Sequence, residues 1–174
     1  MQTLNERLKA AIRDVPDFPK EGILFKDIAP VLKDASLMKS ITHSFSERFA
    51  GQVDVVVGME SRGFIFGTPL AMELGAAFVP ARKPGKLPYT TIGVEYELEY
   101  GTNRLEMHTD AIHAGQRVLI VDDLLATGGT AAATVDLVKQ LGGKVVGCCF
   151  VIELSFLNGA AALGNAPIHS LVTY

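Results

Sequence analysis

The sequence predicts an α/β protein whose central sheet is mainly parallel and is flanked by helices. Short apolar runs at 53–58, 118–121 and 144–154 are rich in β-branched residues, which is typical of buried parallel strands. Helical patterns follow the first two runs, and polar or glycine-containing segments stand where several of the strands should end. Because such sheets bind ligands at the carboxyl ends of their strands, we expect the functional site along that edge.

Composition sets the class of protein. The chain has 174 residues, of which 48% are hydrophobic and 20% charged, as expected for one globular domain with a substantial core. The formal net charge of −3 argues against general nucleic-acid binding, which needs a basic surface. The N-terminal residues lack the apolar core of a signal peptide, and no apolar run reaches membrane-spanning length. We expect a cytoplasmic protein that binds neither nucleic acid nor a membrane.

The only cysteines, Cys148 and Cys149, are adjacent within the third apolar run. Neighbouring residues on a strand point to opposite faces, so a disulfide between them is not expected. Both are interpreted as core thiols in a reducing compartment.

The N-terminal part combines a helix with an apolar, proline-rich segment. Residues 3–12 place apolar side chains at helical spacing. Residues 17–30 then break the pattern with prolines and a glycine, yet they are too apolar for a free linker. Two interpretations stay open: a packed surface loop, or a segment in which Phe25 covers a flat ligand while backbone groups read its edge.

The first predicted strand leads into a candidate anion site. Residues 37–49 form an amphipathic helix pattern, the strand at 53–58 follows, and the segment 59–64 carries Arg62. A guanidinium can hold phosphate oxygens in a bidentate fork, so Arg62 is the candidate ligand. A plain surface charge is the alternative.

A basic segment and a hairpin separate the first and second of these strands. Residues 76–80 form a short strand, and residues 81–89 are basic and rich in glycine and proline. Apolar and polar residues then alternate on both sides of a turn at 101–103, which predicts a hairpin. A flexible basic segment that feeds a hairpin is typical of a lid, which would bring Arg82 and Lys86 over a bound anion. A solvated basic loop is the alternative.

The stretch 118–130 carries the strongest functional signal. Asp122 and Asp123 stand where the strand should end, a small-residue loop follows, and Thr130 opens a helix that continues to about residue 141, before two glycines. Glycines let backbone N–H groups approach an anion, and the helix N-terminus adds a positive dipole end. Adjacent carboxylates repel and need cations or hydroxyl donors. The stretch therefore predicts a phosphate cradle beside a sugar- or metal-binding edge, rather than an ordinary glycine-rich turn. Walker A and dinucleotide-binding patterns are absent from the sequence.

The run Val-Asp-Asp-Leu-Leu-Ala-Thr-Gly-Gly-Thr at 121–130 resembles the phosphoribosyl-pyrophosphate (PRPP) motif of type I phosphoribosyltransferases. Its particular form is similar to that of the adenine phosphoribosyltransferases, as are the segment 18–28 and the Leu-Glu-Tyr-Gly run at 98–101. The resemblance extends from the first helix to Leu154. It implies the type I phosphoribosyltransferase fold in a single domain, 1–174, with a base-capping hood at about 1–34 and a flexible hairpin lid at about 82–108.

The resemblance also implies a reaction: adenine and PRPP give AMP and pyrophosphate, a step of purine salvage. Mg²⁺ is the implied cofactor, held mainly through substrate and water with Asp122 and Asp123 nearest, because it favours oxygen ligands and substrate phosphates. A homodimer is implied as well. The apolar run 63–74 is a candidate dimer face, although its spacing serves a core equally well.

Residues are carried over from the family by position. Phe25 would stack on adenine while backbone groups of Leu24 and Lys26 read its edge. Leu157 would line the base pocket, with core packing as the alternative. A cis peptide bond is expected between Glu60 and Ser61. The resemblance implies five catalytic residues: Glu99, Tyr100, Arg62, Arg82 and Lys86. The residues implied to bind PRPP and its 5′-phosphate are Asp122, Asp123, Ala126, Thr127, Gly128, Gly129 and Thr130. The residues implied to bind pyrophosphate are Glu60, Ser61, Arg62, Arg82 and Lys86.

Three questions stay open from the sequence. Glu99 would act at N7 of the base, as a general base or as a stabiliser of the protonated base. In one alternative, the acceptor is another purine base, such as hypoxanthine, guanine or xanthine. Phe25 and the run at 98–101 disfavour this alternative. In the other, the chain is a non-enzymatic sensor of PRPP or a purine, which the acidic balance and Glu99 disfavour.

Overall fold

The structure is a computed structural model that describes residues 2–97 and 102–174. Its centre is a five-stranded sheet with the strand order β4-β3-β7-β8-β9, in which every neighbouring pair is parallel. The predicted α/β class and parallel sheet are confirmed. The strands are β3 (Val55–Met59), β4 (Ala77–Ala81), β7 (Arg117–Leu125), β8 (Lys144–Glu153) and β9 (Ile168–Thr173).

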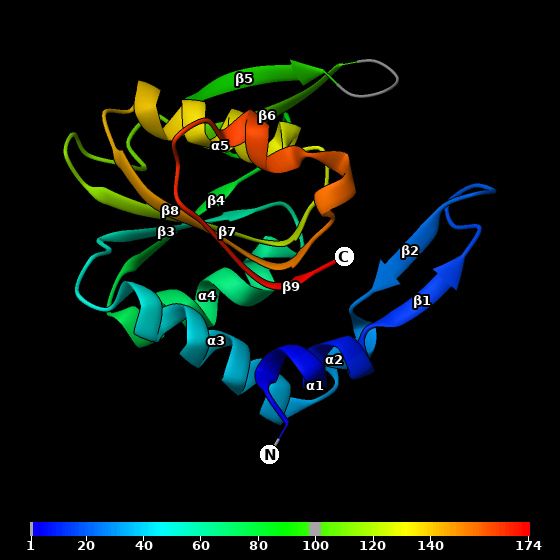
Figure 1. The fold of residues 1–174 in the computed structure, drawn as a ribbon. Helices are drawn as coiled ribbons and strands as arrows, with labels where there is room; N and C mark the ends of the chain where they lie inside the picture. The colour runs from blue at the N-terminus through cyan, green and yellow to red at the C-terminus, as the bar shows by residue number, and fades with distance from the viewer. Residues whose placement is uncertain (1, 98–101) are drawn as a thin grey trace.

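Helices cover both faces of this sheet, as Figure 1 shows. One face packs on α3 and α4, and the other lies under α5 together with the β5–β6 hairpin. The short helices α1 and α2 lie beyond α3. The helical elements are α1 (Leu4–Ala11), α2 (Ala29–Leu32), α3 (Ala35–Phe49), α4 (Gly63–Leu74), α5 (Gly129–Gln140) and the 3₁₀ turns η1 (Ser155–Leu157) and η2 (Gly159–Leu163).

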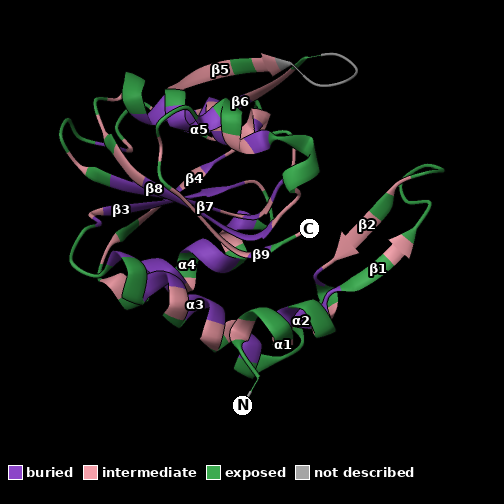
Figure 2. Cartoon of the chain, in the orientation of Figure 1, coloured by how far each residue is buried: buried purple, intermediate pink, exposed green. Residues whose placement is uncertain are grey.

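The apolar runs explain this arrangement. Every residue of β3 is buried, because a parallel strand between two helical layers has no solvent-facing side. Two core clusters result, one on each face of the sheet. Figure 2 shows the buried residues concentrated in the sheet and on the helix faces turned toward it. Cys148 and Cys149 are both buried and unbridged, as predicted.

Two antiparallel hairpins complete the fold. β5 (Thr91–Glu97) pairs with β6 (Thr102–His108), which confirms the predicted hairpin. β1 (Arg13–Pro16) pairs with β2 (Leu24–Asp27), a pairing that the prolines and glycine of this segment did not suggest. The β1–β2 hairpin stands to one side of the central sheet (Figure 1). Within the described ranges, none of the helices has both the length and the apolar character needed to cross a membrane.

Candidate active site

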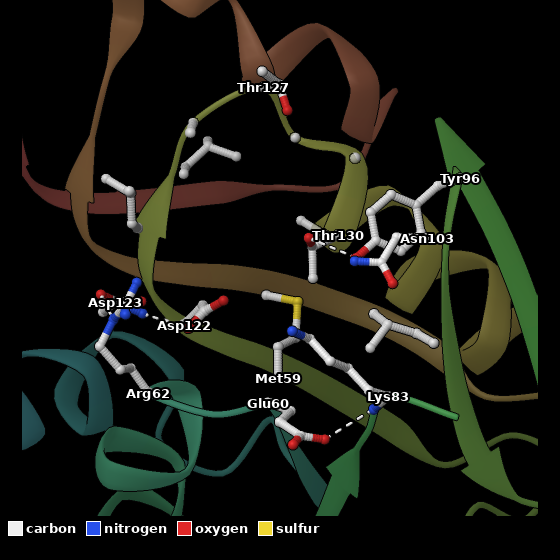
Figure 3. A pocket seen from close by; sticks show the side chains of 17 residues that line it. Met59, Glu60, Arg62, Lys83, Tyr96, Asn103, Asp122, Asp123, Thr127 and Thr130 are labelled. Atoms are coloured by element: carbon white, nitrogen blue, oxygen red, sulfur yellow. Dashed lines mark hydrogen bonds and ion pairs between the residues drawn. The ribbon is translucent and has the colours of Figure 1, made fainter. Parts of the chain in front are cut away.

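A cavity of about 300 Å³ opens at the carboxyl ends of β3 and β7, the edge predicted from the sequence. Figure 3 shows it from close by, with the turn before α5 on one side and the β5–β6 hairpin on another. A second hollow of about 290 Å³ shares Glu60, Arg62, Lys83 and the two aspartates with it. The main cavity is lined by Met59, Glu60, Arg62, Lys83, Tyr96, Asn103, Leu105, Asp122, Asp123, Leu124, Leu125, Ala126, Thr127, Gly128, Gly129, Thr130 and Ala131.

The turn between β7 and α5 is the segment predicted to be a phosphate cradle. Gly128 has φ 85° and ψ −4°, a left-handed conformation that favours glycine. A Cβ atom there would lie 2.3 Å from the carbonyl oxygen of Gly159, so the site excludes a side chain sterically as well. All five of the predicted residues, 126–130, line the cavity. The first residues of α5 therefore present backbone N–H groups and the positive end of the helix dipole to it.

Asp122, Asp123 and Arg62 form a charged group beside the cradle. Arg62 Nε donates to Asp123 Oδ2 at 2.5 Å, and the Asp123 side chain is only 8% exposed. Burial alone would lower the pKa of Arg62, but the charge and hydrogen bond of Asp123 outweigh it and raise that pKa. Burial, and then the charge of Asp123, raise the pKa of Asp122 well above its ordinary value. Asp123 is thus paired with a guanidinium, whereas Asp122 is a buried carboxyl whose pKa is raised.

Glu60 ties the basic segment to the end of β3. The Glu60–Ser61 peptide bond is cis, as predicted. The Glu60 carboxylate accepts from Arg82 Nε at 3.2 Å and from the Lys83 N–H at 2.9 Å. Burial favours a higher pKa for Glu60, but these donors outweigh it and lower that pKa. The Glu60 carboxylate is thus an anchor for cations, while Ser61 lines the second hollow.

The basic segment brings one unexpected side chain to the site. Arg82 lies between Glu60 and the Lys86 carbonyl oxygen, to which its Nη1 donates at 3.3 Å. Lys86 itself is exposed and is not among the residues that line the two cavities. Lys83 lines both, although it was not predicted as a site residue. Its place in the same basic segment as Arg82 and Lys86 suggested a role at the site. The sequence, however, does not show which of these three cationic side chains points toward the cavity.

The β5–β6 hairpin contributes two further residues that were not predicted, Tyr96 and Asn103. They are cross-strand partners, and both line the main cavity. Thr130 Oγ1 donates to the Tyr96 hydroxyl at 3.2 Å, as the dashed line in Figure 3 marks. In the sequence, only the alternating pattern that predicted the hairpin pointed to these two residues. Glu99 and Tyr100, predicted from the resemblance, lie outside the described residues.

The four residues predicted for adenine do not line this cavity. Leu24, Phe25 and Lys26 belong to β2, where Phe25 packs edge-on against Phe18 with ring centroids 5.1 Å apart. Lys26 Nζ donates to Asp14 at 2.6 Å, so its side chain is engaged within the hairpin. Leu24 is 51% exposed and Leu157, in η1, is 41% exposed, so Leu157 is not a plain core residue. Three of these residues therefore lie on the β1–β2 hairpin and the fourth in η1, outside the lining of the cavity.

The acidic groups fit a divalent cation only in part. Among the described residues, no group of three or more His, Cys, Asp or Glu side chains is arranged to hold a metal ion. Asp122 and Asp123 supply carboxylate oxygens, and the Asp123 carboxylate is already bonded to Arg62. A hard cation at this edge would therefore take most of its ligands from substrate oxygens and water, as Mg²⁺ commonly does.

Comparison with known proteins identifies the family. Residues 31–160 match the model of the phosphoribosyl transferase domain. The chain is 58% identical over 169 residues to the adenine phosphoribosyltransferase of Acetivibrio thermocellus, covering 96% of this chain and 99% of that one. The crystal structure of the Thermoanaerobacter pseudethanolicus enzyme of that name aligns with a TM-score of 0.94 at 53% identity, covering 99% of this chain and 100% of that one. The Saccharomyces cerevisiae enzyme, complexed with adenine and an imino-altritol bisphosphate, aligns with a TM-score of 0.92 at 45% identity, covering 97% and 98% of the two chains. The chain therefore belongs to the phosphoribosyltransferase family and, within it, to the adenine phosphoribosyltransferases.

Proposed function

We propose that this protein transfers the 5-phosphoribosyl group of PRPP to adenine at the cavity beside β3 and β7, giving AMP and pyrophosphate. One observation carries the proposal. A helix N-terminal cradle, an aspartate pair and a basic segment enclose one cavity at the carboxyl edge of a parallel sheet. This combination suits a ligand with a phosphate at one end, hydroxyl groups in the middle and a second anionic group at the other.

The cradle and the aspartates would hold the donor. Backbone N–H groups of residues 126–130, with the hydroxyls of Thr127 and Thr130, donate to the 5′-phosphate. Asp122 and Asp123 accept from the ribose hydroxyls. Their negative charge also stabilises positive charge that develops at the anomeric carbon as the bond to pyrophosphate breaks.

The basic side chains would receive the leaving group. Glu60 and Ser61 present their backbone to pyrophosphate, and Arg62 donates to its oxygens from the start of α4. Arg82 and Lys86, together with Lys83, add positive charge from the basic segment. Bound through substrate oxygens and water, Mg²⁺ would neutralise part of the pyrophosphate charge.

The acceptor would be read by the hood, residues 1–34 of a single domain that spans 1–174. Phe25 stacks on adenine, and backbone groups of Leu24 and Lys26 pair with its polar edge. Leu157 borders the base from the other side. Backbone reading supports discrimination between purines, because a wrong base leaves a buried donor or acceptor unpaired. The lid, residues 82–108, would bring Glu99 to N7 of the base and Tyr100 to the reaction centre.

We further propose a cytoplasmic homodimer. Five residues of α4 are buried in the core, but the same helix exposes Met72 by 79% and Ile65 by 41%. Apolar side chains exposed to this extent suit a contact with a second copy. One face of α4 would thus pack in the core, while another face would contact the second copy, the two roles that its sequence allowed.

Turnover with a panel of purine bases tests this function. The full chain is mixed with PRPP and adenine, hypoxanthine, guanine or xanthine, with and without Mg²⁺, and pyrophosphate release is measured. We expect release with adenine and Mg²⁺, and little with the 6-oxopurines. Release with hypoxanthine or guanine instead would reassign the acceptor. Tight binding of PRPP without release in any mixture would favour a sensor and overturn the proposal.

A further inference from the structure

The hydroxyl of Tyr96 lies against the phosphate cradle from outside the central sheet. Tyr96 is on β5, and its ring packs against the core cluster on the α5 side of the sheet. Its hydroxyl reaches the main cavity and contacts Thr130, the second residue of α5, at 3.2 Å. A phenylalanine would fill the same apolar position. The phenolic oxygen therefore needs an explanation beyond packing.

The elements that carry Tyr96 and Thr130 have hydrogen bonds of their own. The cross-strand partner of Tyr96, Asn103, accepts the Arg104 N–H through its side-chain oxygen at 2.9 Å, and in Figure 3 the Asn103 amide nitrogen lies on the side of Tyr96 and Thr130. On the other side, Thr134 Oγ1 donates to the Thr130 carbonyl oxygen at 2.8 Å. Both hydroxyls thus belong to elements that are fixed by their own hydrogen bonds.

The chemistry of two hydroxyls restricts how they share an anion. Each carries one hydrogen and can accept through its oxygen. A phosphate oxygen only accepts at this position, so Thr130 must turn its single hydrogen to the phosphate. In the structure Thr130 Oγ1 donates to the Tyr96 hydroxyl at 3.2 Å. Once the Thr130 hydrogen points to a phosphate, this bond would reverse, with the Thr130 oxygen as acceptor and the Tyr96 O–H as donor. A chain from Tyr96 to Thr130 to phosphate results, in which each bond polarises the next.

We propose that Tyr96 is a positioning residue for the donor 5′-phosphate, acting through the hydroxyl of Thr130. The inference rests on the proposed function, because it takes residues 126–130 as the phosphate cradle. Tyr96 fixes the Thr130 hydroxyl in the orientation that donates into the cavity. It contacts neither the reacting atoms nor the pyrophosphate end, so its contribution belongs to donor affinity and not to the chemical step.

The test compares Tyr96→Phe, Thr130→Val and the double variant with the wild-type protein. Affinity for ribose 5-phosphate is measured by calorimetry, and KM for PRPP and kcat with adenine are measured in parallel. We expect Tyr96→Phe to weaken ribose 5-phosphate binding about 2- to 10-fold, the range for one net hydrogen bond. KM for PRPP should rise by a similar factor with kcat unchanged. In the Thr130→Val background, Tyr96→Phe should have no further effect.

Two controls separate positioning from general damage. Thr42→Val removes a hydroxyl on α3 that donates to the Met38 carbonyl oxygen at 3.0 Å and lines neither cavity, so it should change neither constant. Affinity for inorganic pyrophosphate should be the same in Tyr96→Phe and the wild type. Unchanged ribose 5-phosphate affinity in Tyr96→Phe, or an equal loss in both backgrounds, would overturn the inference.

The same measurements keep this inference apart from the proposed function. A wild-type protein that releases no pyrophosphate with adenine, yet binds ribose 5-phosphate in a Tyr96-dependent way, would refute the proposed function and support the inference. Full turnover in both the wild type and Tyr96→Phe, with equal KM for PRPP, would refute the inference alone.

Discussion

Arg62 Nε lies 2.5 Å from Asp123 Oδ2, which ties the residue before α4 to the end of β7. The Asp123 side chain is 8% exposed and the Arg62 side chain 49%, so the pair lies at the boundary between core and solvent. Arg62 also lines both cavities. One guanidinium thus stabilises a buried carboxylate and stays available to an anionic ligand.

Replacing Arg62 should therefore affect stability as well as activity. Arg62→Ala leaves Asp123 buried beside Asp122 without its guanidinium. We expect a loss of about 1–3 kcal/mol in the free energy of unfolding, the penalty for an unpaired buried acceptor. Urea unfolding measures it. Adding Asp123→Asn to Arg62→Ala should restore much of the stability but not the activity.

An exposed ion pair provides the matched control. Arg13 donates to Asp27 at 2.6 Å, but its side chain is 60% exposed, and such pairs contribute about 0–1 kcal/mol. Arg13→Ala should therefore change stability less than Arg62→Ala. Equal losses in the two variants would show that the burial of Asp123 is irrelevant.

The raised pKa of Asp122 predicts a pH-dependent gain from its removal. A carboxyl whose pKa is higher in the folded state contributes stability below its ordinary value of 3.8, and that contribution is lost as pH rises through the folded-state pKa. Asp122→Asn should therefore raise Tm at pH 7, and the gain should shrink toward pH 4. Its neutral oxygen still accepts the Asp123 N–H, which donates at 2.8 Å in the wild type. Activity should fall, because a proposed ribose ligand is lost.

Asp54 is a comparison for Asp122, because its pKa is lowered and the effect of its removal on Tm should have the opposite sign. Hydrogen bonds from Arg117 lower the pKa of Asp54 from 3.8 to about 2. Its contribution is present above 3.8 and is lost as pH falls through about 2, so Asp54→Asn should lower Tm at pH 7 and have less effect in acid. Thermal unfolding between pH 3 and 8 follows both variants. A pH-independent difference for either would contradict the assigned cause.

Alanine substitutions at Gly128 and Gly115 distinguish the cost of backbone strain from the cost of steric overlap in the cradle. Gly128 and Gly115 have φ of 85° and 86°, but only Gly128 faces a backbone atom, the Gly159 carbonyl oxygen at 2.3 Å from a built Cβ. Gly115→Ala should cost about 1–2 kcal/mol, the penalty of a left-handed alanine, and leave KM for PRPP unchanged. Gly128→Ala should cost more and also weaken ribose 5-phosphate binding, because the turn must move. Calorimetry and urea unfolding measure the two effects, and equal outcomes for both variants would contradict the steric explanation.

Glu106 holds the basic segment on β6. Its backbone exchanges two hydrogen bonds with Arg82, and its carboxylate accepts the Gly85 N–H at 3.3 Å and Arg104 Nε at 3.2 Å. Glu106→Ala keeps the backbone bonds but releases the segment at Gly85. We expect KM for PRPP to rise about 2- to 10-fold, as for the loss of one or two net hydrogen bonds. Steady-state kinetics with varied PRPP provide the measurement.

Glu95→Ala is the control for this prediction. Its carboxylate also pairs with Arg104, at 3.8 Å, but its side chain is 69% exposed. It should leave KM for PRPP unchanged. If Glu95→Ala and Glu106→Ala raise KM alike, the effect comes from Arg104 and not from the hold on Gly85.

The sequence was sufficient to predict those features that depend on a single strand, turn or helix. Burial on both faces requires apolar β-branched strands, which is why the parallel sheet was predictable. The cradle at 126–130 was predictable because its glycines and the helix after it are contiguous. Arg62 was predictable because it follows a buried strand of the same sheet, and strand ends meet at one edge.

Tertiary structure decided which side chains from other segments reach that edge. Lys83 rather than Lys86 lines the cavities, and the Lys83 N–H donates to Glu60, which lines them too. Tyr96 meets Thr130 only because the hairpin packs across α5. The sheet and the glycine turn before α5 were predictable without the tertiary structure, since each depends on contacts between near neighbours in the chain. The partner of Asp123 lies 61 positions away and that of Thr130 lies 34 positions away, and only packing brings them together.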